Sequence, residues 1–370
     1  MTDERHNDRN LYIALELSQK EWRLCIGDGQ RKRHVRVTDR SEEGVKNAIE
    51  RGKARLGLPE DTRVYSCFEA GRDGFWIHRL LTKMGVENVV VDSASIEVDR
   101  RLRRTKTDRL DAEKLLEMLI RFYRFGEKRV WKVVKVPTPE QEDQRREHRE
   151  YERLQKERKA HLARIRSLLA MHGVNVKRVS PQVVNCLDWA GQPLPACLQR
   201  ELTREWERLE QTVKQMVAIE ALTEARIKTP TNHAETVAQK LYALKAIGPR
   251  SSWTFSQEFF AWRTFRNRRQ VGALAGLVGG RYDSGSSRRD LGITKAGNKR
   301  VRRLAIEVAW QWLRHQPNSA LTLWYKKRFA EGGKRLRRIG IVAVARRLLI
   351  DLWHYLEHGQ VPVGAILKSA

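Results

Sequence analysis

LYIALEL, residues 11–17, is an apolar run and the first of three strand-length segments that decide the fold of the N-terminal part of the sequence. Residues 21–27 and 33–38 are the other two, and polar turns such as Gly27-Asp-Gly29 separate them. Strand-length segments joined by short turns of this kind predict hairpin-linked β-strands. We therefore expect the chain to begin with three consecutive strands.

Helices and strands alternate after these three strands. A helix is predicted from Ser41, because Glu42 and Glu43 suit the positive end of its dipole. It is followed by a predicted strand at 63–69, a helix at 74–84, a strand at 88–92 and a helix from about 107 to 124. The resulting order, βββαβαβα, is typical of a ribonuclease-H-like α/β domain. It does not fit a Rossmann domain, and the sequence has no G-x-G-x-x-G.

Pro137 and Pro139 mark the end of this first domain, which we assign to residues 1–136. Two charged segments with narrow apolar stripes follow. The stripes consist of Tyr151, Leu154, His161, Leu162, Ile165, Leu168 and Leu169, and then of Leu198, Leu202, Trp206, Leu209, Val213, Met216 and Val217. This spacing predicts a coiled-coil hairpin over residues 137–230 that dimerises or separates two domains; the alternative is a helix pair packed on its own domain. Residues 231–370 are expected to form a mostly helical, basic domain.

The composition indicates a nucleic-acid partner. The chain has 370 residues, 41% of them hydrophobic and 32% charged, with a formal net charge of +28. Such a charge repels itself unless a polyanion neutralises it, and Lys and Arg gain affinity by displacing counterions from phosphates. A basic ribosome-associated or merely soluble protein is the alternative. A membrane surface is disfavoured, because no single amphipathic segment concentrates the charge.

Three further features predict a cytoplasmic protein. The four cysteines form no C-x-x-C pair, so neither a zinc site nor a disulfide framework is predicted. The first residues lack the apolar stretch of a signal peptide. Arg346 and Arg347 interrupt the apolar run from Ile339 to Trp353, which therefore cannot span a bilayer.

Four acidic residues in the first domain predict a metal site. Glu16 lies in the first strand and Glu69 ends the fourth, and neighbouring strands would bring both to one sheet edge. Asp108 and Asp111 share a face at the start of a helix that Thr107 can cap. Four carboxylates repel one another unless cations lie between them, and Mg²⁺ (or Mn²⁺) prefers oxygen ligands. The alternatives are acids that favour the helix dipole and a Glu16 on a solvated edge strand.

A serine-rich turn, Tyr282-Asp-Ser-Gly-Ser-Ser287, is the second candidate site. A serine oxygen can attack a phosphodiester when arginines stabilise the charge on the phosphate, and Gly285 permits the tight backbone that exposes Ser284. Arg281, Arg288, Arg289, Lys295 and Arg300 are the candidate phosphate contacts around it. Most Ser/Gly turns beside arginines are linkers or phosphate-binding loops, which is the alternative.

Upstream of this turn, Leu244-Lys-Ala-Ile-Gly-Pro249 is similar to a helix-hairpin-helix turn. The backbone amides of such turns grip DNA phosphates without reading bases, so Lys245 and Arg250 are further candidate nucleic-acid contacts. Arg250 stands where these motifs prefer a second glycine, so the match is partial.

These motifs occur together, and in this order, in one known family. They are Tyr12-Ile-Ala-Leu-Glu-Leu-Ser18, Phe68-Glu-Ala-Gly71, Arg104-Thr-Lys-Thr-Asp-Arg-Leu-Asp-Ala112, Leu244-Lys-Ala-Ile-Gly-Pro249, Leu274-Ala-Gly-Leu277, Arg281-Tyr-Asp-Ser-Gly-Ser-Ser287 and Thr294-Lys-Ala-Gly297. Over most of its length the chain resembles the IS110 group of insertion-sequence transposases. That group is related to the Piv/MooV DNA invertases and comprises serine recombinases guided by a bridge RNA.

The resemblance implies a specific mechanism. A RuvC-like domain would carry the acidic set on Glu16, Glu69, Asp108 and Asp111, and Ser284 would be the nucleophile that forms a transient phosphoserine link to DNA. The working site would join the acids of one subunit to the serine of another in a dimer or tetramer. A structured guide RNA from the same element would pair with donor and target DNA.

The chain departs from the family pattern at one acid. The first acid of the usual set is Asp, and here it is Glu16, whose carboxylate reaches farther by roughly one bond length. Ser284 aligns with the family position, although Ser286 and Ser287 are chemically competent too. A metal-only RuvC-like nuclease or junction resolvase, and a non-catalytic nucleic-acid-binding protein, are the alternative functions.

Overall fold

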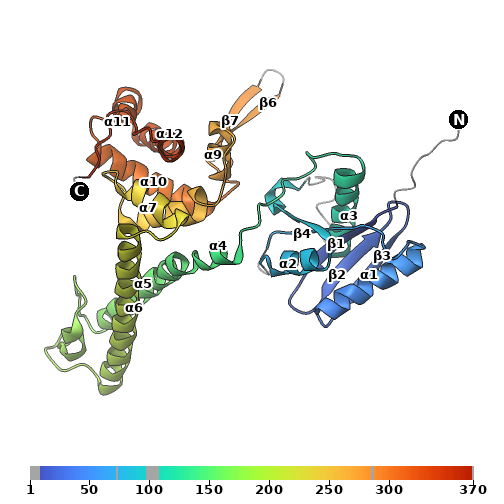
Figure 1. Cartoon of the computed structure of the whole chain (residues 1–370). Helices are drawn as coiled ribbons and strands as arrows, with labels where there is room; N and C mark the ends of the chain where they lie inside the picture. The colour runs from blue at the N-terminus through green and yellow to red at the C-terminus, as the bar shows by residue number, and fades with distance from the viewer. Residues whose placement is uncertain (1–8, 72–73, 97–107, 285–286, 369–370) are drawn as a thin grey trace. The chain divides into compact units, whose positions relative to one another are not determined.

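A computed structural model describes residues 9–71, 74–96, 108–284 and 287–368 of the chain (Figure 1). The chain divides into two compact units, residues 1–137 and 138–370. No helix within the described residues is long and apolar enough to cross a membrane.

The first unit is built on one five-stranded sheet. Its strands are β1 (Leu11–Leu17), β2 (Trp22–Gly27), β3 (Lys32–Val37), β4 (Val64–Glu69) and β5 (Glu87–Val91). Their order in the sheet is β3-β2-β1-β4-β5. Strands β1, β2 and β3 pair antiparallel, whereas β4 pairs in parallel with both β1 and β5. The sheet is therefore mixed, with its first strand at the centre.

Helices cover both faces of this sheet. Helices α1 (Glu42–Leu56) and α2 (Trp76–Lys83) bury apolar side chains such as Ile49 and Leu81 against one face. Helix α3 (Asp108–Arg124) packs on the other face. Strands buried on both sides read as nearly continuous apolar runs, which is why β1 is apolar up to Glu16. The predicted mixed α/β order of elements is confirmed.

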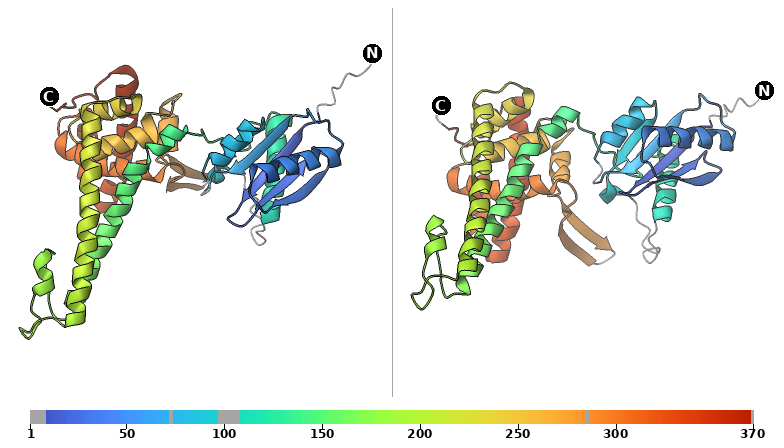
Figure 2. Two further views of the ribbon diagram at one scale, coloured as in Figure 1. Left: turned by 60° about the horizontal axis from the view of Figure 1, so that its bottom comes forward. Right: turned by 90° about the horizontal axis from the view of Figure 1, so that it is seen from below.

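Two long helices of the second unit run antiparallel beside each other (Figure 2). They are α5 (Arg146–Ala170) and α6 (Ala196–Lys228), and we call the pair the helical hairpin. Their apolar stripes meet along the hairpin, where Ile165, Leu169 and Leu202 are fully buried. The predicted helix pair is thus observed, and its assignment as a coiled coil stays a prediction.

The rest of the second unit is mostly helical, as predicted. Its remaining helical elements are α4 (Pro139–Asp143), η3 (Pro181–Asn185), α7 (His233–Tyr242), α8 (Pro249–Phe255), the π-helix η4 (Ser256–Phe260), α9 (Arg268–Leu274), α10 (Lys299–His315), α11 (Ala320–Tyr325), the π-helix η5 (Lys326–Ala330) and α12 (Lys334–His358). Helices α7 to α12 enclose a core that contains Phe255, Phe259 and Trp312. The exception to the helical pattern is a two-stranded hairpin, β6 (Gly279–Ser284) and β7 (Ser287–Ile293), which extends from the helical body (Figure 1).

Candidate functional site

The sheet brings two of the predicted acids to the same edge and face. Strand β1 pairs with β4 so that Ala14 lies opposite Cys67, two residues before Glu16 and Glu69. Side chains alternate between faces with a period of two, so both carboxylates share the face of the Ala14–Cys67 pair. That face packs against α3, and both acids are half-buried there. The expected convergence of Glu16 and Glu69 is confirmed by this register.

Helix α3 contributes a third acid on its inner face. Asp111 is half-buried, one turn before Leu115 and two turns before Met118, both of which are buried against the sheet. The carbonyl oxygen of Leu115 lies 3.8 Å from Cys67 Sγ. Burial raises the pKa of the Cys67 thiol, and the negative charge of Glu69 raises it further. The Glu69 carboxylate is therefore close to the interface between the sheet and α3, the helix that carries Asp111.

Carboxylate oxygens are suitable donors for Mg²⁺ or Mn²⁺, so the chemistry of this set fits the expected ions. The described residues contain no group of three or more His, Cys, Asp or Glu side chains placed to hold a metal ion. Asp108 is the first residue of α3, one turn before Asp111, and its side chain lies outside the described part. The described part of the fold thus brings the acids to one sheet–helix interface, but it does not place three or more of them around a single metal position.

A charged cluster that the sequence analysis missed fixes α3 to the sheet. Glu113 accepts hydrogen bonds from Lys32 Nζ at 2.6 Å and His34 Nε2 at 2.7 Å on β3, and from Arg109 Nε at 3.2 Å. The bonds from Lys32 and His34 lower the pKa of Glu113 to about 2. Only the Arg109–Glu113 spacing of four residues was a visible signal in the sequence.

Ser284 is the last residue of β6, and its backbone pairs with Ser287 at the start of β7. The Gly285-Ser286 step between them lies outside the described residues. Ser284 is therefore at the end of a projecting strand instead of in a loop between helices. Arg281, Arg288 and Arg289 belong to the same two strands, and nothing is described of their side chains.

The loop after β7 locks the base of this hairpin onto the helical body. Gly297 has φ of 116°, and a Cβ there would stand 2.3 Å from the Leu274 carbonyl oxygen, so only glycine fits. Asn298 caps α10 by accepting from the amides of Arg300 and Val301. Lys295 is exposed and has a positive φ of 57°, an uncommon conformation for a residue with a side chain.

The buried carboxylate of Glu258 links this loop to the helical hairpin. It accepts from His148 Nε2 at 2.9 Å and Arg149 Nε at 2.8 Å on α5, and from Asn298 Nδ2 at 3.1 Å. Burial alone would raise its pKa, but the bonds from His148 and Arg149 hold the pKa of Glu258 well below its usual value. The base of the serine hairpin and the start of the helical hairpin therefore meet at one ionised group.

Two of the predicted nucleic-acid contacts are engaged inside the protein. Arg300 Nε binds Glu152 at 2.8 Å, and the guanidinium of Arg250 lies 4.3 Å from the centre of the Tyr151 ring. Lys245 is exposed in the turn between α7 and α8, which is the turn that resembles a helix-hairpin-helix. The role of these residues in binding stays a prediction.

A different set of cations is free in the described structure. We call it the η5–α12 basic surface, and its members are Lys326, Lys327, Arg328, Lys334, Arg335, Arg337 and Arg338. All seven are exposed, and within the described residues none has a carboxylate at ion-pair distance. Free cations release more counterions on binding phosphate than cations that are already paired. The charge run from 326 to 338 was the sequence signal for this surface.

Comparison with known proteins identifies the class of protein. The sequence profile described as "Transposase IS116/IS110/IS902 family" matches residues 238–324. The chain is 40% identical to "Putative transposase y4rJ" of Sinorhizobium fredii over 97% of this chain and 95% of that protein. It is 24% identical to "Transposase for insertion sequence element IS1111A" of Coxiella burnetii, over 75% of this chain and 74% of that protein.

These matches define a transposase. The similarity to the Sinorhizobium protein extends over nearly the whole length of both chains, beyond the segment that the profile covers. The chain belongs to the IS116/IS110/IS902 family of insertion-sequence transposases.

Proposed function

We propose that this transposase cuts and rejoins DNA through a covalent link to Ser284, with the acids of its first unit as a metal-binding site. The observation that carries the proposal is that Glu16 and Glu69 share the sheet face that packs against α3, the helix that carries the half-buried Asp111. Half-buried carboxylates that converge at one interface repel one another, and a cation between them relieves this repulsion. The strand order and the helix on this face are consistent with a ribonuclease-H-like, RuvC-like domain.

The serine step is a transesterification. The Ser284 oxygen bonds to the phosphorus of the scissile phosphodiester, its proton is removed, and the bridging oxygen of the DNA strand leaves as a protonated hydroxyl. A hydroxyl of the recipient strand reverses the exchange and releases Ser284. The number of phosphodiester bonds is conserved, so no external energy source is needed.

Different residues of this chain would bind the metal ion, bind the phosphate and position the serine. Glu16, Glu69, Asp108 and Asp111 would hold Mg²⁺ or Mn²⁺, which supplies positive charge beside the scissile phosphate. Arg281, Arg288, Arg289 and Lys295 are the candidate groups that bind phosphate oxygens near the serine. The rigid loop at Gly297 and Asn298 holds the base of the hairpin and so limits where Ser284 can reach.

The partners follow from the same proposal. Donor and target DNA are the substrates, and a guide RNA from the same element would select them by base pairing. The net charge of +28 supports binding to more than one polyanion. A dimer or tetramer would allow the acids of one copy to serve the serine of another.

A denaturing gel tests the proposal directly. Labelled donor DNA is incubated with protein, Mg²⁺ and RNA transcribed from the flanks of the element. Wild type is compared with Ser284→Ala, Asp108→Ala and the matched variant Ser287→Ala. We expect a protein–DNA adduct with wild type and Ser287→Ala that is absent from the other two.

Two outcomes would contradict the proposal. Nicked DNA that persists in Ser284→Ala but not in Asp108→Ala would indicate a metal-only nuclease. An adduct that forms equally with and without Mg²⁺ and in Asp108→Ala would leave the acids without a catalytic role.

A further inference from the structure

Residues 360–368, which we call the C-terminal tail, lie against the turn between α7 and α8. This α7–α8 turn consists of residues 243–248, and the two segments pair through their backbones. The amide of Lys245 donates to the Ile366 carbonyl oxygen at 3.1 Å, and the amide of Lys368 donates to the Ala243 carbonyl oxygen at 2.8 Å. The tail is therefore joined directly to the turn that resembles a helix-hairpin-helix.

The Lys368 side chain bonds to both ends of this turn. Its Nζ donates to the carbonyl oxygen of Tyr242, the last residue of α7, at 2.6 Å, and to that of Ile247 at 2.8 Å. The same nitrogen lies 3.4 Å from the centre of the Tyr242 ring. An ammonium group has three donors, and these three contacts account for all of them. Lys368 therefore closes the turn and has no donor left for a phosphate.

A buried glutamine joins the same two segments. Gln316, directly after α10, is fully buried, and its Nε2 donates to the carbonyl oxygens of Lys245 at 2.7 Å and Ile366 at 2.9 Å. Its Oε1 accepts from the amide of Ile366 at 2.7 Å. Buried amide groups are costly unless they are bonded, and both ends of this amide are. The two backbone polar groups of Lys245 are thus fixed, one by the tail and one by Gln316.

Burial of apolar surface does not account for the position of the tail. The side chains of Val363, Ile366 and Leu367 are 78%, 43% and 44% exposed. Ala246, within the turn, has φ of 86°, a conformation that residues with a side chain rarely adopt. Such a conformation persists only where the surrounding structure over-determines it, and it is concentrated at functional sites. The polar contacts of the tail therefore hold the turn in one strained conformation.

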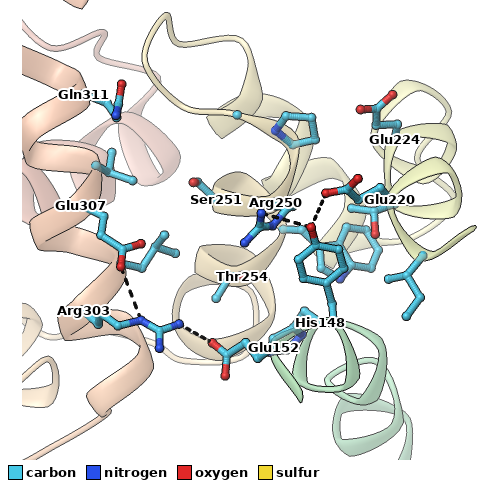
Figure 3. Close-up of a pocket in the computed structure, with 18 residues that line it drawn as sticks. His148, Glu152, Glu220, Glu224, Arg250, Ser251, Thr254, Arg303, Glu307 and Gln311 are labelled. Carbon is cyan, nitrogen blue, oxygen red and sulfur yellow. Dashed lines mark hydrogen bonds and ion pairs between the residues drawn. The ribbon is translucent and has the colours of Figure 1, made fainter. Parts of the chain in front are cut away.

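Lys245 is the cation that the held turn presents. Its side chain is exposed, whereas Arg250, just beyond the turn, donates to the Tyr151 hydroxyl at 3.3 Å inside the cavity of Figure 3. Ordering of flexible groups opposes binding. Because the backbone of Lys245 is already fixed by folding, a phosphate that binds its ammonium has only the side chain to order.

We propose that Lys368 is a positioning residue for DNA binding, and that with the tail it holds the α7–α8 turn so that Lys245 contacts a backbone phosphate. Contacts to phosphates fix the orientation of a protein on DNA without reading its sequence. Lys368 acts through Lys245 and does not itself contact the nucleic acid. This inference rests on the DNA binding of the proposed function, and not on its serine step or metal site.

The salt dependence of DNA binding tests this proposal in a double-mutant cycle. The full chain, freed of nucleic acid, is titrated with a short DNA duplex at several salt concentrations, without divalent cations so that no strand is cut. Each lost phosphate contact reduces the magnitude of the slope of log K against log salt by about 0.9. We expect this reduction in Lys245→Met and in Lys368→Met, and no further reduction in the double variant, because both substitutions remove one and the same contact. Lys46→Met, which removes an exposed charge on α1, is the matched control and should change the slope less.

Each outcome decides the matter. A slope that is unchanged in either single variant, or an equal loss in Lys46→Met, would overturn the proposal. A double variant that loses about 1.8 would show that Lys368 contacts DNA independently and would also overturn it. A loss in Lys368→Met much larger than one contact would mean that the tail holds the whole unit and not the turn. The Ser284 adduct is measured separately, so a normal adduct beside a failed cycle would refute only this inference.

Discussion

Glu258→Gln is the substitution that best tests how the second unit is held together. The Glu258 side chain is 3% exposed and bonds His148, Arg149 and Asn298. Glutamine has the same shape but lacks the charge, so it leaves the Arg149 guanidinium without its counter-charge. Removing one partner of a buried ion pair costs about 3–5 kcal/mol. Because Arg149 is 41% exposed and partly screened, we expect the lower end, about 3 kcal/mol.

Scanning calorimetry of the full chain measures this loss. For a unit of this size each kcal/mol shifts the melting temperature by about 2–4 °C, so its transition should fall by about 6–12 °C. Glu152→Gln is the matched control. This carboxylate also binds two arginines, Arg300 and Arg303, but it is 21% exposed. Its loss should cost about 1 kcal/mol or less.

The direction of the pKa shift of Glu258 predicts how the stability lost in Glu258→Gln depends on pH. The folded-state pKa of Glu258 is held below its usual value, so its stabilisation is present above the unfolded pKa and is lost only as the pH falls towards the depressed value. The difference between wild type and Glu258→Gln should therefore persist at pH 5. A shift no larger than that of Glu152→Gln, or a difference that disappears at pH 5, would refute the reasoning.

Three other predictions concern the acids, the basic surface and α3. Asp111→Asn should lower DNA cleavage by more than about 100-fold, because losing even a group that only supports a metal ligand lowers activity about 10–100-fold. Glu16→Asp should retain activity. Similar activity of the two variants in a cleavage assay would contradict the metal-site proposal. Replacing Lys334, Arg335, Arg337 and Arg338 by Gln should reduce the slope of log K against log salt by up to about 3–4, at about 0.9 per duplex phosphate contact. Filter binding over a salt series checks this, and Lys46→Gln/Arg51→Gln on α1 is the control, whose slope should change less if the η5–α12 basic surface binds the backbone. Glu113→Gln should make the free energy of unfolding of the first unit less dependent on pH in the acid range. The reason is that the pKa of Glu113 is lowered to about 2 from 4.5, so its stabilisation is present above the upper value and is lost as the pH falls to the lower one. Denaturant melts between pH 2 and pH 6 measure this against Glu117→Gln, an exposed acid of the same helix; identical curves for the two variants would show that the cluster does not stabilise α3.

Local patterning was sufficient for most of the first unit. The apolar runs, the turn at Gly27-Asp-Gly29 and the acids after Ser41 located its strands and helices within one or two residues. Ser41 caps α1 by accepting from the amide of Gly44, as a helix start of this composition predicts. These features depend on neighbours in sequence, and so they are visible without a fold.

The β6–β7 hairpin was missed because its strands are short and rich in Gly, Arg and Ser. The segment was predicted as a turn within a helical domain, whereas strands continue to Ser284 and resume at Ser287. The sequence signal for this hairpin was two strand-length segments within residues 279–293, one on each side of a Gly-Ser step. The chemistry of the candidate serine was recognised, but the strand that carries it was not.

Contacts between residues far apart in the sequence determine which cations are free to bind phosphate. Sequence placed Arg300 and Arg250 among the phosphate contacts, but helix α5, more than 90 residues away along the chain, provides Glu152 and Tyr151 to engage them. The exposed cations on η5 and α12 have no such neighbour among the described residues. Long-range ion pairs depend on which surfaces the fold brings together, and no local pattern reports that.

The sequence by itself determined the family, the order of elements in the first unit, the basic character and the identity of the candidate acids and serine. These properties are set by residue type, spacing and local periodicity. Only the tertiary structure decided that Glu16 and Glu69 share the sheet face that packs against α3, the helix of Asp111, that Ser284 ends a projecting strand, and that one buried carboxylate joins the two hairpins of the second unit. The physical reason is that strand register and helix packing are settled by burial of apolar surface between segments far apart in the chain, and the charges are then positioned by that packing.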